Sequence, residues 1–418
     1  MNAPVHFDPV SDASTLPLDA IDVSNPKLYQ DDIWHPYFAR LRRDAPVHYR
    51  QDGMYGSFWS VTKFKDIMQV ETSHQIYSSD VKLGGITITD RPMAYRRPSF
   101  LSSDPPRHDD QRKVVSPIVA PANLQNMEPI IRERVCRVLD GLPRGETFDW
   151  VQRVSIELTT LMLATLFDFP LEERRKLTYW SDMSTADVNA GGEVDSEEKR
   201  LEILTEAVRV FTALWHERKA RQGGFDLISM LAHAEATRNL VDDPAEFLGN
   251  LVLLIVGGND TTRNSMSGGL WALCKHPAEY QKLRDNPGLI PNMVPEIIRW
   301  QSPIVHMRRT ALADAELGGK QIRKGDKVVM WYISGNRDED SIDRPNAFII
   351  DRARPRHHMS FGFGIHRCVG NRLAELQLTI LWEEIMRRFP VIELMDEPKR
   401  MYSNFIHGIT ALPVRIPA

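Results

Sequence analysis

The chain has 418 residues, with 52 basic and 56 acidic side chains and a formal charge of −4. Hydrophobic residues make up 42% and charged residues 26% of it, which is typical of soluble globular proteins and excludes a disordered chain. Nucleic-acid binding needs a basic face, so we expect no nucleic-acid partner. The three cysteines, Cys136, Cys274 and Cys368, are too few for a disulfide framework and fit a reducing compartment.

The first residues show neither the basic region nor the apolar run of a signal peptide. The strongest apolar run, residues 251–256, is far shorter than the ~20 residues that span a bilayer. We therefore expect a cytoplasmic protein with no membrane anchor. Residues 1–25 are rich in Pro, Asp and Ser and predict an irregular arm, and no break in composition divides residues 26–418, which predict one domain.

Along the chain, helical periodicity predominates and strand patterns are few and short. Two long irregular stretches, 78–100 and 183–195, are typical of lids or binding loops. The fold class expected is mainly α with small β-sheets. The clearest predicted strands are 48–50 with 58–61, 327–332 and 410–416, and clear helical spacing covers 131–139 and 373–380.

The longest predicted helix begins after Asp243, a plausible N-cap that is followed by Pro244 and, at capping-box spacing, by Glu246. It runs to about Cys274, with Pro277 beyond it. Gly257 and Gly258 interrupt this pattern, and each costs about 1 kcal/mol relative to alanine in a helix. A close helix crossing or a functional site beside the helix could offset that cost.

Residues 361–370, Phe-Gly-Phe-Gly-Ile-His-Arg-Cys-Val-Gly, form the most informative segment. Their glycines allow close backbone approach and positive φ, and a helix is expected to follow directly. That helix N-terminus, Arg367 and His366 could stabilise a Cys368 thiolate, which suits haem iron with one protein ligand. A glycine-rich turn with a buried thiol is the alternative. Zinc, with His357 and His358 as further ligands, lacks a Cys-x-x-Cys pair.

This segment resembles the haem-binding loop of the cytochrome P450 superfamily, and three further motifs follow the family order over roughly residues 35–418. The resemblance implies a single triangular-prism haem-thiolate domain over 26–418 that binds haem b. Cys368 would be the metal ligand. Phe361, Gly362 and His366 would contact the cofactor.

The resemblance also assigns roles in the long helix. Thr261 would hydrogen-bond the oxygen bound at the iron, Asp260 would relay protons toward it, and the helix would open locally at Gly257 and Gly258. From the residues alone, a helix crossing with Asp260 capping a neighbour is an equally good interpretation. A peroxide-driven hydroxylase would not need this acid and hydroxyl pair.

Glu296 and Arg299 share a helix face at i, i+3 and match the family's structural Glu-x-x-Arg pair. A later arginine would join them, and both Arg352 and Arg354 remain candidates. For the haem carboxylates the resemblance implies His108, Arg112, Arg309 and His366, of which His108 and Arg112 lie at i, i+4 after Asp104-Pro105-Pro106. Any one of them alone could be ordinary surface charge.

Segments 258–266, 306–310 and 358–364 resemble the bacterial alkane and fatty-acid terminal hydroxylases, which implies ω-hydroxylation of medium-chain alkanes, fatty acids or alkyl-like compounds with O2. Electrons would come from a ferredoxin and its NAD(P)H-dependent reductase, steered by Arg112, Lys113, Arg367 and Arg372, and a monomer is expected. Alternatives are a hydroxylase of bulkier terpenes or steroids and a non-catalytic haem or lipid-binding protein. The implied substrate pocket is lined by Leu253, Val256, Gly257, Ile304, Val305, Phe405 and Ile406.

Overall fold

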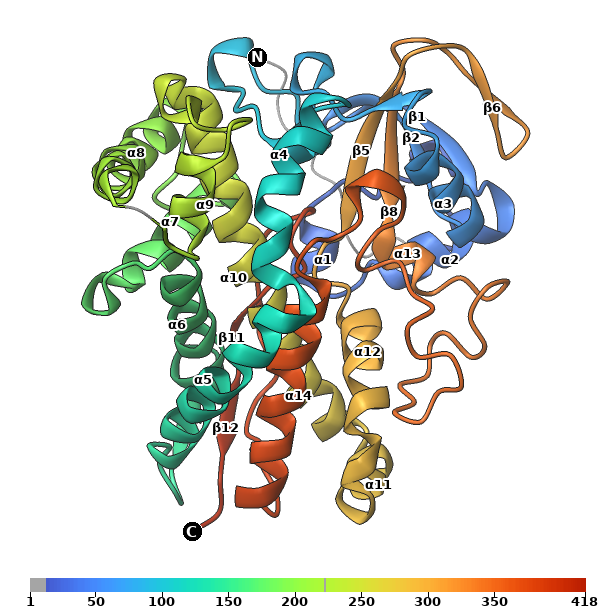
Figure 1. Cartoon of the computed structure of the whole chain (residues 1–418). Coiled ribbons are helices and arrows are strands. Elements are labelled where there is room, and N and C mark those ends of the chain that lie inside the picture. The colour runs from blue at the N-terminus through green and yellow to red at the C-terminus, as the bar shows by residue number, and fades with distance from the viewer. Residues whose placement is uncertain (1–12, 222) are drawn as a thin grey trace.

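Helices form most of the protein and a mixed sheet lies to one side of them in the computed structural model, which describes residues 13–221 and 223–418 (Figure 1). The helices are α1 Lys27–Gln30, α2 His35–Asp44, α3 Phe64–Thr72, α4 Arg107–Val115, α5 Pro121–Asp140, α6 Ile156–Leu166, α7 Arg175–Thr185, α8 Glu197–Ala220, α9 Leu227–His233, α10 Pro244–Lys275, α11 Pro277–Asp285, α12 Ile290–Gln301, α13 Tyr332–Gly335 and α14 Asn371–Arg388. The strands are β1 Val47–Gly53, β2 Gly56–Val61, β3 Tyr77–Ser78, β4 Thr147–Asp149, β5 His306–Ala311, β6 Ala315–Leu317, β7 Lys320–Ile322, β8 Lys327–Trp331, β9 Glu393–Leu394, β10 Lys399–Arg400, β11 Ile409–Ala411 and β12 Pro413–Arg415.

The largest sheet has the strand order β1-β2-β8-β5-β3. Strands β2 and β8 pair in parallel, and the other neighbours are antiparallel. The strands predicted at 48–50, 58–61 and 327–332 are three of its members. With helices forming most of the protein, the predicted class, mainly α with small β-sheets, is confirmed. The predicted β segment 410–416 is confirmed but divides into two strands: β11 pairs with β10, whereas β12, which begins at Pro413, pairs with β4 and β9.

The predicted long helix is confirmed as α10. The Asp243 carboxylate accepts hydrogen bonds of 3.1 Å from the N–H groups of Ala245 and Glu246. The Glu246 carboxylate does not complete a capping box within the described residues. It binds Arg107 Nε at 2.9 Å and Gln111 Nε2 at 2.6 Å, and so ties the start of α10 to α4.

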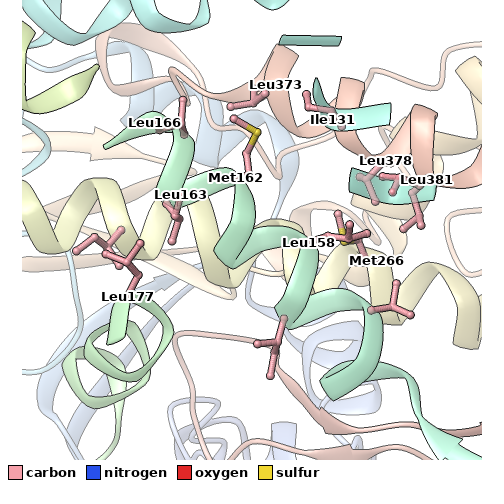
Figure 2. Packing of buried hydrophobic residues seen from close by; sticks show 14 of the residues in the cluster. Ile131, Leu158, Met162, Leu163, Leu166, Leu177, Met266, Leu373, Leu378 and Leu381 are labelled. Carbon is pink, nitrogen blue, oxygen red and sulfur yellow. The ribbon is translucent and has the colours of Figure 1, made fainter. Parts of the chain in front are cut away.

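Apolar side chains of α6 hold α10 in place. Figure 2 shows Leu158, Met162 and Leu163 of α6 among Met266 of α10 and Leu378 of α14. All five are buried in the main hydrophobic cluster. Burying a side chain of this size contributes about 1.5–3 kcal/mol, so this packing fixes the central helix that carries the Gly-Gly-Asn-Asp-Thr-Thr motif.

The N-terminal arm packs against the body where the structure describes it. Ile21 and Val23 are buried, the Tyr29 hydroxyl donates to the Val23 carbonyl at 2.7 Å, and Asn404 donates to the Ser24 carbonyl at 2.7 Å. Residues 1–12 of the predicted arm lie outside the described residues. Across the described residues, every helix is too short or too polar to cross a bilayer.

Candidate active site

A cavity of about 450 Å³ lies beside α10 and brings together most of the predicted site residues. The 361–370 segment forms part of its wall, and both predicted irregular stretches contribute to it. The second stretch is shorter than expected, because α7 continues through Met183 to Thr185. Predicted residues in the wall are Arg112, Leu253, Val256, Gly257, Thr261, Ile304, Phe361, Gly362, His366, Cys368 and Phe405.

Val305 and Ile406 do not line this cavity, which corrects two of the predicted pocket positions. Val305 is fully buried in a second hydrophobic cluster with Trp331, and Ile406 is fully buried as well. Val305 follows Ile304 and Ile406 follows Phe405, and both Ile304 and Phe405 face the cavity. Ile304 pairs with Ile406 in a β-bridge. Successive side chains of extended backbone point to opposite sides, so only one residue of each pair reaches the cavity.

The loop that carries Cys368 depends on its glycines. Gly362 and Gly364 have φ of 64° and 63°, a region that side chains disfavour. A Cβ at Gly362 would also lie 2.7 Å from Glu71 Oε2. The Cys368 N–H donates to the Phe361 carbonyl at 2.8 Å and closes the loop just before α14.

The surroundings of the Cys368 thiol act on its pKa in opposite directions. Burial has the larger effect and raises the pKa overall, whereas the backbone N–H groups of Gly370 and Asn371 and the guanidinium groups of Arg112 and Arg367 oppose it. The sequence also suggested that His366 helps to stabilise the Cys368 thiolate, which would require a charged ring. Burial and nearby cations hold the pKa of His366 far below its usual range, so its ring is neutral and adds no positive charge.

Two histidine nitrogens beside the cavity lack partners among residues 13–221 and 223–418. They are His108 Nε2 and His366 Nδ1, both buried, and the two rings meet edge to face with centroids 4.5 Å apart. Arg112 of α4 donates to the Arg367 carbonyl and also lines the cavity. His366 Nδ1 donates when Nε2 accepts from the Ser79 hydroxyl at 3.0 Å, whereas His108 Nδ1 lies 2.7 Å from the Asp109 carboxylate, so His108 Nε2 donates only when the ring carries both protons. Unpaired buried donors are unfavourable, and the two carboxylates of haem are acceptors that would satisfy them. The residues present therefore fit the cofactor.

Arg309 does not line the cavity in this conformation. It binds Glu71 of α3 at 3.0 Å, and both side chains are buried. Glu71 also accepts from the Tyr332 hydroxyl at 2.6 Å and from the Phe363 N–H at 2.6 Å. Arg309 thus acts on the cysteine loop through Glu71. The role of Glu71 was not predicted from the sequence, because nothing in the residues around an acid in a short helix indicates a contact with residue 363.

Thr261 faces the cavity from α10, and its hydroxyl donates to the Gly257 carbonyl at 2.9 Å. Helix α10 is continuous from Pro244 to Lys275, so the local opening implied by the resemblance is not seen in the described conformation. A hydroxyl that shares the carbonyl of the preceding turn can leave it for another acceptor without breaking the helix.

Asp260 points away from the cavity and is fully buried against α7. Its Oδ1 accepts from Ser181 at 3.2 Å, from Asn259 at 2.9 Å and from Arg263 at 2.9 Å, while Oδ2 has no partner in the described residues. Burial raises its pKa to about 6 against the opposing charge of Arg263. Arg263 also binds the partly exposed Asp182 at 2.9 Å, which links the buried acid toward the surface.

The open question of the third partner of Glu296 is settled by the structure. Arg299 binds Glu296 at 2.7 Å, and Arg352 binds it at 3.0 Å. All three side chains are buried, whereas Arg354 is exposed. Glu296 also accepts from the Ile349 N–H at 2.9 Å. The cluster lies outside the cavity and joins α12 to the segment before the cysteine loop.

Comparisons with known proteins agree with this site. The cytochrome P450 family model matches residues 288–416. Linalool 8-monooxygenase of Pseudomonas putida is 37% identical over 94% of this chain and 98% of its own. A methyl-branched lipid omega-hydroxylase of Mycobacterium tuberculosis is 32% identical over 92% of this chain and 91% of its own. The structure of cytochrome P450-153 from Novosphingobium aromaticivorans has 47% identity and a TM-score of 0.89, over 94% of this chain and 99% of that one.

Cys368 and Thr261 face the same cavity, and buried histidine nitrogens that lack partners in the described residues lie beside it. This combination is typical of a haem-thiolate protein. With relatives this similar over nearly the whole chain, the chain belongs to the cytochrome P450 family. It is a P450 monooxygenase that binds haem b and uses O2 and electrons from a redox partner to oxidise apolar substrates.

Proposed function

We propose that the protein hydroxylates the terminal carbon of medium-chain alkanes, fatty acids or similar alkyl compounds. One observation carries the proposal: the same cavity holds Cys368, Thr261 and the apolar side chains of Leu253, Val256 and Ile304. Burial of each methylene contributes about 0.8 kcal/mol, so an alkyl chain can bind against such a wall. The omega-hydroxylase named among the relatives supports attack at a chain end.

Bound haem supplies the chemistry that activates O2 with two electrons and inserts one oxygen atom into a C–H bond. The Cys368 sulfur would hold the cofactor, with Arg112, His108 and His366 at its carboxylates. Thr261 would hold a proton at its hydroxyl inside the cavity. Asp260 would take protons from the side of the partly exposed Asp182, with which it shares Arg263, and pass them toward Thr261 after a side-chain rotation, while the Arg263 guanidinium keeps its own protons.

Attack at a terminal methyl demands positioning, because methylene C–H bonds are weaker than methyl C–H bonds. A narrow channel that admits only the chain end to the reaction site would provide that selectivity. The residues that would form it near Thr261 are Val256, Gly257, Ile304 and Phe405.

We also propose a ferredoxin with an NAD(P)H-dependent reductase as the electron source. Lys113, Arg367 and Arg372 are exposed on α4, on the cysteine loop and on α14, and would attract an acidic partner. Reversal of charge at Arg372 is expected to slow electron transfer most at low ionic strength. The monomeric state stays a prediction.

The test is product analysis with octane and dodecanoic acid in a reconstituted system. Terminal alcohols as main products would support the proposal. Mainly subterminal alcohols, or no turnover of any linear chain, would contradict it. A bulkier terpene is the second candidate, favoured by the relative that is named linalool 8-monooxygenase, and linalool belongs in the same assay.

A further inference from the structure

One arginine in the cavity wall has donors that no group in the described part of the chain uses. Arg97 lies between β3 and α4 and lines the cavity. Its Nε and Nη2 atoms are buried, and neither has a hydrogen-bond partner in residues 13–221 or 223–418. A guanidinium offers five N–H donors, and a buried one is unfavourable without acceptors. Two unused donors beside a ligand cavity therefore indicate an acceptor on the ligand.

The neighbouring arginines differ from Arg97 because each has partners. Arg91 and Arg200 each bind Glu197 at 3.2 Å, one at each carboxylate oxygen. Arg200 also donates to the Ser184 carbonyl at 3.0 Å, and Arg96 donates to the Val81 carbonyl at 2.9 Å. Glu197 thus already binds two arginines, and neither Nε nor Nη2 of Arg97 reaches it in residues 13–221 and 223–418. An acceptor on a bound ligand would satisfy these two donors.

This end of the cavity is also positively charged. Its wall holds the four arginines together with two carboxylates, those of Asp187 and Glu197. Asp187 is already engaged by the Tyr55 hydroxyl at 3.1 Å. Burial and the charges of Arg91 and Arg200 lower the pKa of Arg97 to about 10, so the group remains a cation at neutral pH. An anion is the ligand that such a site favours.

The backbone of Arg97 lies beside the first half of α10. The backbone of Arg97 and Pro98 packs against Gly249 of α10, where an added Cβ would lie 3.1 Å from the Arg97 carbonyl carbon. Gly257 and Thr261 face the cavity about 12 Å and about 18 Å farther along the helix, at 1.5 Å per residue. Leu253 lines the wall between Gly249 and Gly257. An apolar stretch of the cavity wall thus lies between Arg97 and Thr261, where the reaction is predicted. Its length is comparable with that of an extended alkyl chain of medium length.

We infer that Arg97 binds the carboxylate of a linear fatty acid and so holds its methyl end toward Thr261. The inference rests on the proposed terminal hydroxylation and narrows its substrate class from alkyl compounds in general to carboxylates. A guanidinium binds a carboxylate through two parallel N–H···O bonds, which fixes orientation as well as affinity. Arg97 is thus a specificity-determining residue.

The experiment titrates the haem-loaded protein with dodecanoate, methyl dodecanoate and dodecane and follows the Soret shift on binding. The variants are Arg97→Leu, Arg97→Lys and, as a control, Arg323→Leu, whose side chain is 76% exposed on the β7–β8 turn. The unaltered protein should prefer the acid to its ester. Arg97→Leu should weaken dodecanoate binding by about 10- to 100-fold and leave ester binding unchanged. Arg97→Lys should retain part of the preference, and the control all of it.

Three results would overturn the inference: equal losses for acid and ester, no loss for the acid, or loss of haem from Arg97→Leu, which would assign Arg97 to the cofactor. Failure of the proposed terminal hydroxylation would give a different result in product analysis. In that case the unaltered protein would give no terminal alcohol from the acid, the ester or the alkane. Terminal products from all three with no dependence on Arg97 would overturn this inference alone.

Discussion

Gly257 and Gly258 are neighbours in α10, yet a side chain at each would meet different surroundings. A Cβ at Gly257 would have no atom within 4 Å, because this position opens on the cavity. A Cβ at Gly258 would lie 2.8 Å from Leu163 Cδ2 of α6. The sequence offered a helix crossing and a functional site as rival explanations of this pair. Both glycines line the cavity, and the close helix crossing applies to Gly258 alone.

This difference predicts opposite effects of two alanine substitutions. Gly257→Ala should raise helix stability by up to about 1 kcal/mol and change substrate binding, since its methyl enters the cavity. Gly258→Ala gains the same helix propensity but overpacks the core, so a net destabilisation of up to about 2 kcal/mol is expected. Thermal unfolding and substrate titration of the two variants measure these effects. A less stable Gly257→Ala with unaltered binding would contradict this assignment.

Thr261→Ala should uncouple electron use from product formation. Loss of the hydroxyl that holds a proton in the cavity is expected to lower product per NAD(P)H at least about tenfold, with hydrogen peroxide released instead. Thr205→Ala is a matched control, because that hydroxyl also bonds the carbonyl four residues earlier, at 2.7 Å, on an exposed face of α8. Unchanged coupling in Thr261→Ala would favour the peroxide-driven alternative.

The raised pKa of Asp260 predicts a pH dependence. With a pKa of about 6, the acid is mostly protonated below pH 6, and its protonated fraction falls about tenfold per unit well above that pH. Coupling should therefore decline from pH 6 to pH 8. Asp260→Asn should give low coupling with a flat profile over the same range. A variant profile that keeps the same slope would assign the titration to another group.

Arg352 and Arg354 are separated by one residue and give a matched pair for stability. Arg352→Leu removes a buried partner of Glu296 and should lower the free energy of unfolding by about 3 kcal/mol. Arg354→Leu removes an exposed charge and should change it by less than about 0.5 kcal/mol. Denaturant unfolding of the two variants provides the comparison, and equal losses would refute the assignment of Arg352.

Local patterns were enough to predict α10, the main strands and the cysteine loop. Asp243 caps α10 through its own backbone neighbours, and Gly362 and Gly364 take the positive φ that their residue type allows. Family resemblance added the haem and the Glu296 cluster. The helix cap and the glycine conformations are encoded within a few residues of where they act, whereas the Glu296 cluster joins residues more than 50 positions apart.

Contacts between distant segments could not be predicted in this way. Glu71 reaches the cysteine loop from α3, and it engages Arg309, which the resemblance had assigned to the haem carboxylates. The unpaired donors of Arg97 become visible only in the packed structure, in which Glu197 binds Arg91 and Arg200 instead. The positions of Val305 and Ile406 depend on which side of an extended segment faces the cavity, and that is a property of the packed structure.

The measurement that tests the central claim most directly is the spectrum of the reduced, haem-loaded protein under carbon monoxide. If the Cys368 sulfur is the axial ligand, the Soret band shows the strong red shift of thiolate ligation, and Cys368→Ser loses it. A purified protein whose band stays at the position of histidine-ligated haem, or a Cys368→Ser variant that keeps the red shift, would contradict the assignment of the site.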